Sequence, residues 1–592
     1  MGSSSGLVDW RGRPVDTKKH GGVRASIFIH MLVWLSNVAN IGNMTNLVSY
    51  LNGRMNMGVA QASTTSTGFV AMMQVFTIPA AFLADSYLKR LYTILFFAPV
   101  QILGYIILAI QAHVPSLHPA PCPAGAGANH PPGICEPVHG GNLSLLMLGL
   151  YLICVGEGAV RACLPALGGD QFDEADAAEQ RQAASFFNWY TFAVSLGAFV
   201  GLVLVVWVQD YRGWDAGFAV CAAVVLLGLL VWAAGIPTYR NKVPAGSPIT
   251  RIMQVLVVAF KKRNLQLPSN PDELYQPTEH DSLTGHEILQ RTPGLKCLDK
   301  AAIVEHGSSS GGGNGGGRGA WSLCSVWQVE ETKIVARMVP IFLTATLGYM
   351  PVSVILTFTV QQGNTMDTRL GRIRVSPAML FAIPTVFQMA ILVVYDRAVV
   401  PALRRATGRV GGVTHLQRIG VGFVFSMAAC AVAAAVEARR RSVSSPTVPM
   451  SVFWLTPQFF LLGVVDVTSF VGLLEFFSSE ASDGMKSIGS SIFYCMVGLA
   501  AWLNTMLIEL VNRATRRAGA GGGWLDGADL NRSRLDRFYW LVCGVELVAF
   551  VAYLLFAWRY VYRNDQRVAA DGGVHQHDDM KPASAGVDLG QF

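Results

Sequence analysis

Long apolar stretches recur along the chain, and shorter polar segments separate most of them. A helix that crosses a bilayer needs roughly 20 mostly apolar residues, and twelve stretches approach this length. They lie near residues 26–51, 64–84, 91–112, 144–168, 186–208, 214–236, 334–359, 377–396, 418–436, 450–476, 488–511 and 538–560. The pattern predicts an all-α membrane protein with twelve transmembrane helices.

A long polar insert, at residues 237–332, separates the sixth stretch from the seventh. Its part from 307 to 317 is almost entirely glycine and serine, a composition typical of flexible linkers. The part at 249–263 mixes apolar and basic residues, as helices that lie on a membrane surface do. The predicted organisation is a polar N-terminus, a six-helix bundle, a cytoplasmic linker, a second six-helix bundle and a polar tail, at 1–25, 26–236, 237–332, 333–562 and 563–592.

The composition agrees with a lipid environment. Of the 592 residues, 52% are hydrophobic and 14% are charged, against about 25% charged in soluble proteins. The formal net charge is +7, and basic residues favour the cytoplasmic side of a membrane. Basic residues at 11–24, 89–90 and 261–263 place the N-terminus and the linker inside, whereas the clusters at 439–441 and 513–537 oppose this orientation.

The cysteines indicate no metal site. None of the ten forms a C-x-x-C pair, so neither a metal nor a cofactor is expected. Cys122 and Cys135 share the predicted outer loop, where a disulfide and two free thiols are both compatible with the sequence. The predicted spans show no nucleophile–base pair that would indicate an enzyme. The expected partners are the bilayer and a small-molecule substrate, with no nucleic acid, and both protons and a homodimer are left open.

The charged residues within the spans are the candidates for function. Glu157 and Arg161 lie four residues apart in the fourth stretch, hence on one helix face. Asp466 lies deep in the tenth stretch and Glu546 lies in the twelfth. Because a charge within the bilayer is costly, such groups usually face a cavity or a partner. We expect Glu157 to pair with Arg161. Glu157 and Glu546 are the candidates for proton coupling. A structural ion pair is the alternative role for Glu157, and Glu546 could face either a cavity or a partner helix.

Several motifs resemble those of one family. Residues 156–174 are similar to the signature G-x-G-G-I-K-P followed by G-A-D-Q-F-D-E, and residues 83–90 are similar to a D-x-x-x-x-R loop. The other matches, in family order, are at 186–190, 270–275, 298–302, 328–331, 415–420 and 474–477. The chain therefore resembles the plant nitrate/peptide transporter family, the proton-dependent oligopeptide transporters of the major facilitator superfamily.

The resemblance implies two bundles that rock about a site near the bilayer midplane. It also implies a proton-coupling motif, E-x-x-E-R, on the first helix, but the three charged positions fall on Val33, Ser36 and Asn37. The family lysine that partners those glutamates falls on Arg161, and Glu157 stands where the family usually has an uncharged residue. Our hypothesis is that Glu157 replaces the lost partner and that Arg161, which stays charged, binds an anion.

Two further site predictions rest on the resemblance. Asp466 falls on the family's intramembrane glutamate, which is a substrate-pocket residue in relatives. Asp85 and Arg90 lie in the loop that follows the second span. There they are expected to form charge-assisted contacts that break when the bundles rock.

The predicted function is secondary transport of a small solute. The altered first helix and residues 415–422 are most similar to members that move hormones such as abscisic acid and gibberellin. Nitrate is the alternative, although the nitrate-binding histidine of one member aligns with Val352, whose side chain has no hydrogen-bond donor. A transport-incompetent sensor that signals through the 237–332 insert also stays open. The family implies the plasma membrane as the location, with the vacuolar membrane as the alternative.

Overall fold

The structure of the protein is a computed structural model. The residues it describes are 7–16, 19–57, 59–119, 137–173, 176–244, 246–268, 270, 273–276, 291–304, 321–370, 373–374, 377–408, 411–443, 450–518, 523–525 and 533–562. Cys122 and Cys135, the glycine-rich part of the linker and the tail beyond 562 lie outside these residues. The eight cysteines inside them are free thiols.

The chain divides into two compact units. The larger comprises Met1–Pro248 and Met338–Leu554, and the smaller comprises Ile249–Arg337 and Leu555–Phe592. Within the described residues, twelve helices are long and apolar enough to cross a membrane. This number confirms the prediction from the apolar stretches.

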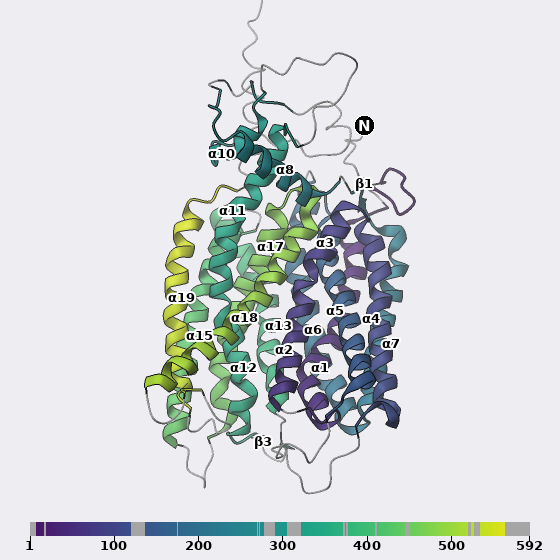
Figure 1. Cartoon of the computed structure of the whole chain (residues 1–592), viewed down its shortest axis with the longest axis vertical. Helices are drawn as coiled ribbons and strands as arrows, with labels where there is room; N and C mark the ends of the chain where they lie inside the picture. The colour runs from purple at the N-terminus through teal and green to yellow at the C-terminus, as the bar shows by residue number, and fades with distance from the viewer. Residues whose placement is uncertain are drawn as a thin grey trace, which may run out of the picture. The chain divides into compact units, whose positions relative to one another are not determined.

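Six spans precede the linker. They are α1 (Gly22–Gly53), α2 (Val59–Val75) continued by α3 (Thr77–Ser86), α4 (Arg90–His113), α5 (Gly140–Gly169), α6 (Ala177–Tyr211) and α7 (Trp214–Ala234). Within this group α1 contacts α6 and α7, while α4 contacts α5 and α7. They are the purple and blue helices of Figure 1.

Six more spans follow the linker and are teal, green and yellow in Figure 1. They are α11 (Val326–Gly348) continued by α12 (Met350–Asn364); α13 (Ala382–Val394) continued by the π-helical turn η6 (Tyr395–Val399) and α14 (Val400–Thr407); α15 (His415–Val443); α16 (Thr456–Val465) continued by the π-helical turn η8 (Asp466–Phe470) and α17 (Val471–Glu480); α18 (Lys486–Ala518); and α19 (Leu535–Trp558). Here α15 contacts α12, α16 and α17.

The other elements of the larger unit are short. They are η1 (Pro115–Leu117), η2 (Ile236–Thr238), η5 (Pro377–Phe381), η7 (Val452–Leu455), η9 (Asp483–Met485) and two antiparallel strand pairs, β1 (Leu7–Val8) with β2 (Asn241–Lys242) and β3 (Arg369–Leu370) with β4 (Ile373–Arg374). The β1–β2 pair ties the N-terminal segment to the chain that follows α7, with Leu7 opposite Lys242.

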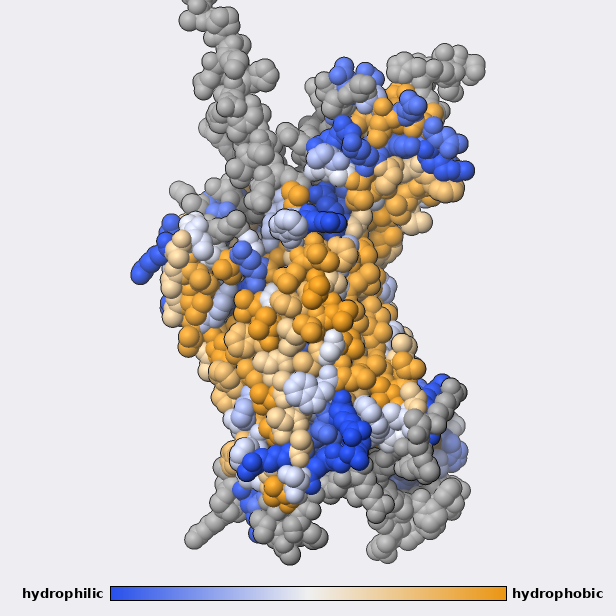
Figure 2. Space-filling view, turned by 90° about the vertical axis from the view of Figure 1, so that its left-hand side faces the viewer, coloured by the Kyte–Doolittle hydropathy of each residue, from blue (hydrophilic) through white to orange (hydrophobic). Residues whose placement is uncertain are grey.

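The outer faces of the spans are apolar. Figure 2 shows a broad hydrophobic band across the middle of one face of the larger unit, with hydrophilic side chains towards the helix ends. Large exposed apolar residues on the helices include Leu227, Leu230, Val424, Leu547 and Val548. A band of this kind suits the hydrocarbon of a bilayer.

Glycines bring α1 and α6 into close contact. A Cβ atom on Gly201 would lie 2.3 Å from the carbonyl oxygen of Val38, and one on Gly197 would lie 2.4 Å from that of Trp34. Small residues spaced four apart allow membrane helices to touch backbone to backbone. This contact determines how α1 presents its polar residues to the neighbouring helices.

The smaller unit contains the linker helices α8 (Pro248–Lys261), α10 (Lys296–Asp299) and η4 (Lys300–Ala302). The helix α8 confirms the amphipathic segment predicted at 249–263. One face of it, with Val255 and Val258, joins an apolar core, while Met253 and Phe260 are exposed. Its attachment to a membrane surface stays a prediction.

Candidate substrate and proton site

A cavity of about 140 Å³ lies in the larger unit between helices of the two halves. It is lined by α1, α2, α5 and α6 from the first half and by η8 and α18 from the second. Its polar or charged side chains are Ser36, Asn37, Gln74, Glu157, Arg161, Tyr190 and Tyr494, and its apolar ones are Val33, Ile41, Val160, Leu164, Val194, Phe470 and Val497. The pair Glu157 and Arg161 therefore faces a cavity.

The predicted pairing of Glu157 with Arg161 is confirmed. Arg161 Nε lies 2.5 Å from Glu157 Oε1, one turn apart on α5. The Glu157 side chain is 1% exposed and the Arg161 side chain is 13% exposed. Because water is nearly excluded, the two charges interact more strongly than a surface pair would.

Polar side chains of α1 and α4 surround the other oxygen of Glu157. Ser36 Oγ donates a hydrogen bond to Glu157 Oε2 at 2.8 Å, and Gln101 Nε2 donates to the same oxygen at 3.1 Å. Gln101 also donates to Asn40 Oδ1, which accepts a second hydrogen bond from the Tyr105 hydroxyl at 2.7 Å. Donors that converge on a carboxylate stabilise its charged form and hold it in position.

A glycine allows this convergence. A Cβ atom on Gly156 would lie 2.5 Å from Gln101 Cβ and 2.7 Å from the carbonyl oxygen of Phe97. The absence of a side chain at Gly156 therefore lets α4 approach α5 closely enough for Gln101 to reach Glu157. Gly158, on the same helix, likewise lies against the backbone of Met73 on α2.

Arg161 keeps donor capacity that its carboxylate partner does not use. Its Nη2 atom is buried and has no hydrogen-bond partner within the described part of the chain. The guanidinium carbon lies 5.9 Å from the centre of the Tyr494 ring on α18. The hydroxyls of Tyr494 and Tyr190 lie 3.4 Å apart. Arg161 thus lines a cavity with aromatic walls and keeps an N–H group that no described residue accepts.

The three uncharged positions of the first-helix motif also face this cavity. Val33, Ser36 and Asn37 all line it. Asn37 Nδ2 donates to the Val33 carbonyl of its own helix at 2.8 Å. Of these three residues, only Ser36 is hydrogen-bonded to Glu157. Glu157 carries the one carboxylate among the residues that line the cavity.

The two remaining acidic candidates lie elsewhere in the larger unit. Asp466 begins the π-helical turn η8 and is a hydrogen-bonding neighbour of the Tyr349 hydroxyl, but it is not among the residues that line this cavity. Glu546 on α19 is fully buried beside Ser426 of α15, with no ion pair found for it among the described residues. The structure therefore brings together Glu157 and Arg161, and not Asp466 or Glu546.

Asp85 and Arg90 connect the two halves at one end of the spans. Asp85 Oδ1 accepts from Arg90 Nη2 at 3.0 Å, and its Oδ2 accepts from the Ile488 amide of α18 at 3.0 Å. Arg90 Nε also donates to Ser487 Oγ at 2.8 Å, and Arg90 pairs with Asp170 at the end of α5. These contacts join the two halves at the predicted cytoplasmic end, and their role in gating stays a prediction.

A second connection, which the sequence-based prediction does not include, joins α6 to the second half. Ser185 and Asn188 both donate to Asp396 Oδ1 in η6, at 2.7 and 3.0 Å. Arg418 of α15 donates to Asn188 Oδ1 at 2.9 Å. The sequence offers one signal for this contact, because residues 186–190 are one of the family-like motifs. Their partners, Asp396 in η6 and Arg418 on α15, are distant in sequence, so the sequence does not predict these contacts.

The site also contains polar residues that the prediction omits, namely Asn40, Gln101 and Tyr105. Ser36 and Asn40 lie four residues apart on α1, and this spacing is a sequence signal for a polar face. Gln101 and Tyr105 show the same spacing on α4.

Comparison with known proteins identifies the family. Residues 91–525 match the family model described as PTR2, POT family. The chain belongs to the POT family. It is 36% identical to Protein NRT1/PTR FAMILY 4.5 of Arabidopsis thaliana over 94% of this chain and 96% of that protein. It is 34% identical to Protein NRT1/PTR FAMILY 4.6 of the same plant, over 94% and 97% respectively.

Solved structures show the same fold. The crystal structure of the POT family transporter PepTSo aligns with a TM-score of 0.61 at 16% identity, over 91% of this chain and 98% of that one. A structure described as an auto-inhibited POT family peptide transporter aligns with a TM-score of 0.58 at 18% identity, over 91% and 98%.

Family membership defines the general activity. The protein is an integral membrane protein of the major facilitator type and a secondary transporter of the POT and NRT1/PTR group, not an enzyme. The Glu157–Arg161 pair, and the uncharged residues at the motif positions of the first helix, therefore belong to a transporter and are to be interpreted in terms of transport.

Proposed function

We propose that this transporter moves a small organic anion and that Arg161 binds its carboxylate. The observation that carries the proposal is Arg161, which lines the cavity and whose buried Nη2 has no partner in the described chain. An arginine stays charged at any physiological pH and matches a carboxylate with two N–H groups. The chemistry of this group therefore favours a monovalent anion.

The walls of the cavity favour a carboxylate with an apolar body. Beside Arg161 lie Val160, Leu164 and Phe470, and Tyr190 and Tyr494 add aromatic surface. Ligand sites commonly combine such apolar walls with a few polar groups that orient the ligand. Hormone-like acids of the abscisic acid or gibberellin type have this composition.

Nitrate is the second candidate, and the size of the cavity favours it. The volume of about 140 Å³ lies below the roughly 300–1,000 Å³ that ligand pockets usually have. A hormone would enter only after the two halves separate, whereas a small inorganic anion needs less space.

Glu157 supplies a route for protons in this proposal. When Glu157 is protonated it no longer neutralises Arg161, so the guanidinium is free to bind the substrate anion. Binding of the proton and binding of the anion then favour each other, as linkage requires. A fixed structural ion pair is the alternative role, and it predicts no such dependence.

An uptake experiment tests the proposal. Cells that express the chain are given labelled nitrate, abscisic acid, gibberellin or a dipeptide at acidic and neutral external pH, with vector controls that remove passive permeation of neutral acid. We expect saturable uptake of a carboxylate that Arg161→Gln abolishes. Arg513→Gln, an exposed arginine on α18, serves as the matched control.

The same experiment distinguishes a transporter from a sensor. Binding of a labelled acid without net movement at saturation would support the sensor and contradict the proposed transport. Uptake that survives Arg161→Gln unchanged would contradict the role of Arg161. As part of the proposal we place the protein in the plasma membrane, and a fluorescent fusion found in the vacuolar membrane would contradict that location.

A further inference from the structure

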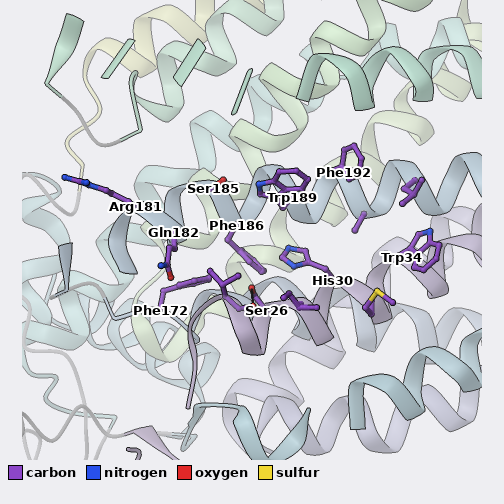
Figure 3. A pocket seen from close by; sticks show the side chains of 15 residues that line it. Ser26, His30, Trp34, Phe172, Arg181, Gln182, Ser185, Phe186, Trp189 and Phe192 are labelled. Atoms are coloured by element: carbon purple, nitrogen blue, oxygen red, sulfur yellow. Dashed lines mark hydrogen bonds between the residues drawn. The ribbon is translucent and has the colours of Figure 1, made fainter. Parts of the chain in front are cut away.

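A second, larger cavity lies on another face of the first half. It has a volume of about 560 Å³ and lies along the N-terminal parts of α1 and α6 (Figure 3). It shares no lining residue with the central cavity. Its volume falls in the range of roughly 300–1,000 Å³ that ligand cavities occupy, and we call it the α1–α6 groove.

The α1–α6 groove is mainly aromatic. In Figure 3 Trp189 and Phe192 lie on one side of it and Phe172 lies on the other, near Ser26, with the rings of Phe186 and His30 between them. Trp34 lies at one end of the groove and Arg181 at the other, next to Gln182. The groove thus has a polar end and an apolar body.

The length of the groove matches one leaflet of a bilayer. On α1 its lining runs from Val23 to Trp34, a rise of about 17 Å at 1.5 Å per residue. The hydrocarbon core of a bilayer is about 30 Å thick, so one leaflet takes about half of that. Both helices are odd-numbered spans and begin on the same, predicted cytoplasmic, side. The polar end of the groove therefore lies at that surface.

Two arginines are available at the groove. Arg181 is exposed, and no ion pair or hydrogen bond is found for its guanidinium in the described chain. The guanidinium carbon of Arg397, in η6, lies 5.7 Å from the centre of the Trp189 ring. Exposed arginines beside an apolar groove complement the anionic lipids of a cytoplasmic leaflet.

Of the carboxylates nearby, Glu179 pairs with Arg240 at 2.7 Å. Asp396 accepts hydrogen bonds from Ser185 and Asn188, which are neutral donors, so its negative charge stays next to Arg397. The positive charge that lines the groove is therefore that of Arg181.

We propose that the α1–α6 groove binds an acidic phospholipid of the cytoplasmic leaflet. One acyl chain lies along the aromatic side chains from Phe172 to Trp34, and the phosphate lies at Arg181. Since Trp189 and Ser185 line the groove and also contact η6, the bound lipid stabilises the contact that must open when the halves rock.

The test uses the purified full-length protein in a non-ionic detergent. Native mass spectrometry measures the retention of phosphatidylserine and of phosphatidylcholine with identical acyl chains. Each arginine near an anionic surface contributes about 1 kcal/mol, or about fivefold in affinity. We expect preferential retention of phosphatidylserine, and about fivefold weaker binding in Arg181→Gln. Arg212→Gln, at the opposite end of α6, is the matched control and should bind like the wild type.

A groove-filling variant locates the acyl chain. Ala193→Phe is expected to reduce retention of phosphatidylserine at an unchanged melting temperature, and the exposed Arg181→Gln gives an independent result if Ala193→Phe does not fold. Equal retention of the two lipids, or retention unaffected by Arg181→Gln, would overturn the proposal. Displacement of the lipid by inorganic phosphate at equal concentration would also overturn it, because it would indicate an anion site without recognition of the acyl chain.

Discussion

The ion pair between Glu157 and Arg161 makes a quantitative prediction about stability. In Glu157→Gln the new glutamine has one oxygen and one NH₂ group in place of two carboxylate oxygens. If its oxygen accepts from Ser36 and Gln101, its NH₂ group points at the guanidinium of Arg161, and both of these groups are donors. Removal of one partner of a buried pair costs about 3–5 kcal/mol, because the other charge is left uncompensated. We expect Glu157→Gln and Arg161→Gln each to lower the free energy of unfolding by that amount.

The double variant separates a charge effect from a packing effect. Glu157→Gln combined with Arg161→Gln leaves no buried charge in the pair, so the two losses should not add: the double variant should lose about 2–3 kcal/mol less than the sum of the two single variants, and this difference is the coupling energy. Chemical unfolding in detergent, followed by tryptophan fluorescence, measures the four free energies.

The chain offers a matched control for this cycle. Glu509 and Arg513 on α18 have the same residue types and the same spacing, but their side chains are 62% and 69% exposed. The same substitutions there should change the free energy of unfolding by no more than about 0.5 kcal/mol. Single variants of Glu157 or Arg161 that lose less than about 1 kcal/mol, or losses that simply add in the double variant, would refute the reasoning.

Three further predictions follow from other parts of the structure. Asp85→Asn removes a charged acceptor from the closed end, so spin labels on the two halves should show a larger population with that end open, and an unchanged distance distribution would contradict the gating role. Gly201→Leu places a side chain against α1 and should cost about 1–3 kcal/mol or more through overpacking, whereas Gly544→Leu, at a site with open space, should be tolerated when melting temperatures are compared. Cys297 is exposed and should react rapidly with maleimide, so Cys297→Ser should remove a fast phase from the labelling kinetics. Burial raises the pKa of the Cys324 thiol to about 11, so its labelling should stay slow near neutral pH and rise as the pH approaches 11, because the thiolate is the reactive form.

The spans and one pair of the site could be predicted from local sequence alone. The apolar stretches locate the twelve helices because hydrocarbon tolerates few polar groups, and each stretch is local in sequence. Glu157 and Arg161 could be paired because four residues make about one turn of a helix. The ends of the helices were less predictable. The apolar stretch predicts a span at 186–208, but α6 begins at Ala177, where the side chain of Asp176 caps the helix.

The rest of the site depends on how the helices pack. Gln101 reaches Glu157 only because Gly156 lets α4 lie against α5, and such a contact between distant residues leaves no local pattern. Asp466 lies at a π-helical turn, which changes the faces that a helix presents. In the structure Phe470, at the end of that turn, lines the central cavity and Asp466 does not. The role of Asp466 in binding substrate therefore stays a prediction.

Proton-driven transport by the reconstituted protein tests the central claim, that Glu157 and Arg161 replace the missing charges of the first helix. Proteoliposomes with an acidic exterior are given the transported acid, and accumulation above the concentration in protein-free liposomes is measured for wild type and for folded Glu157→Gln. The claim predicts that Glu157→Gln still exchanges labelled for unlabelled substrate but no longer accumulates it in response to the proton gradient. Accumulation equal to that of the wild type would contradict it.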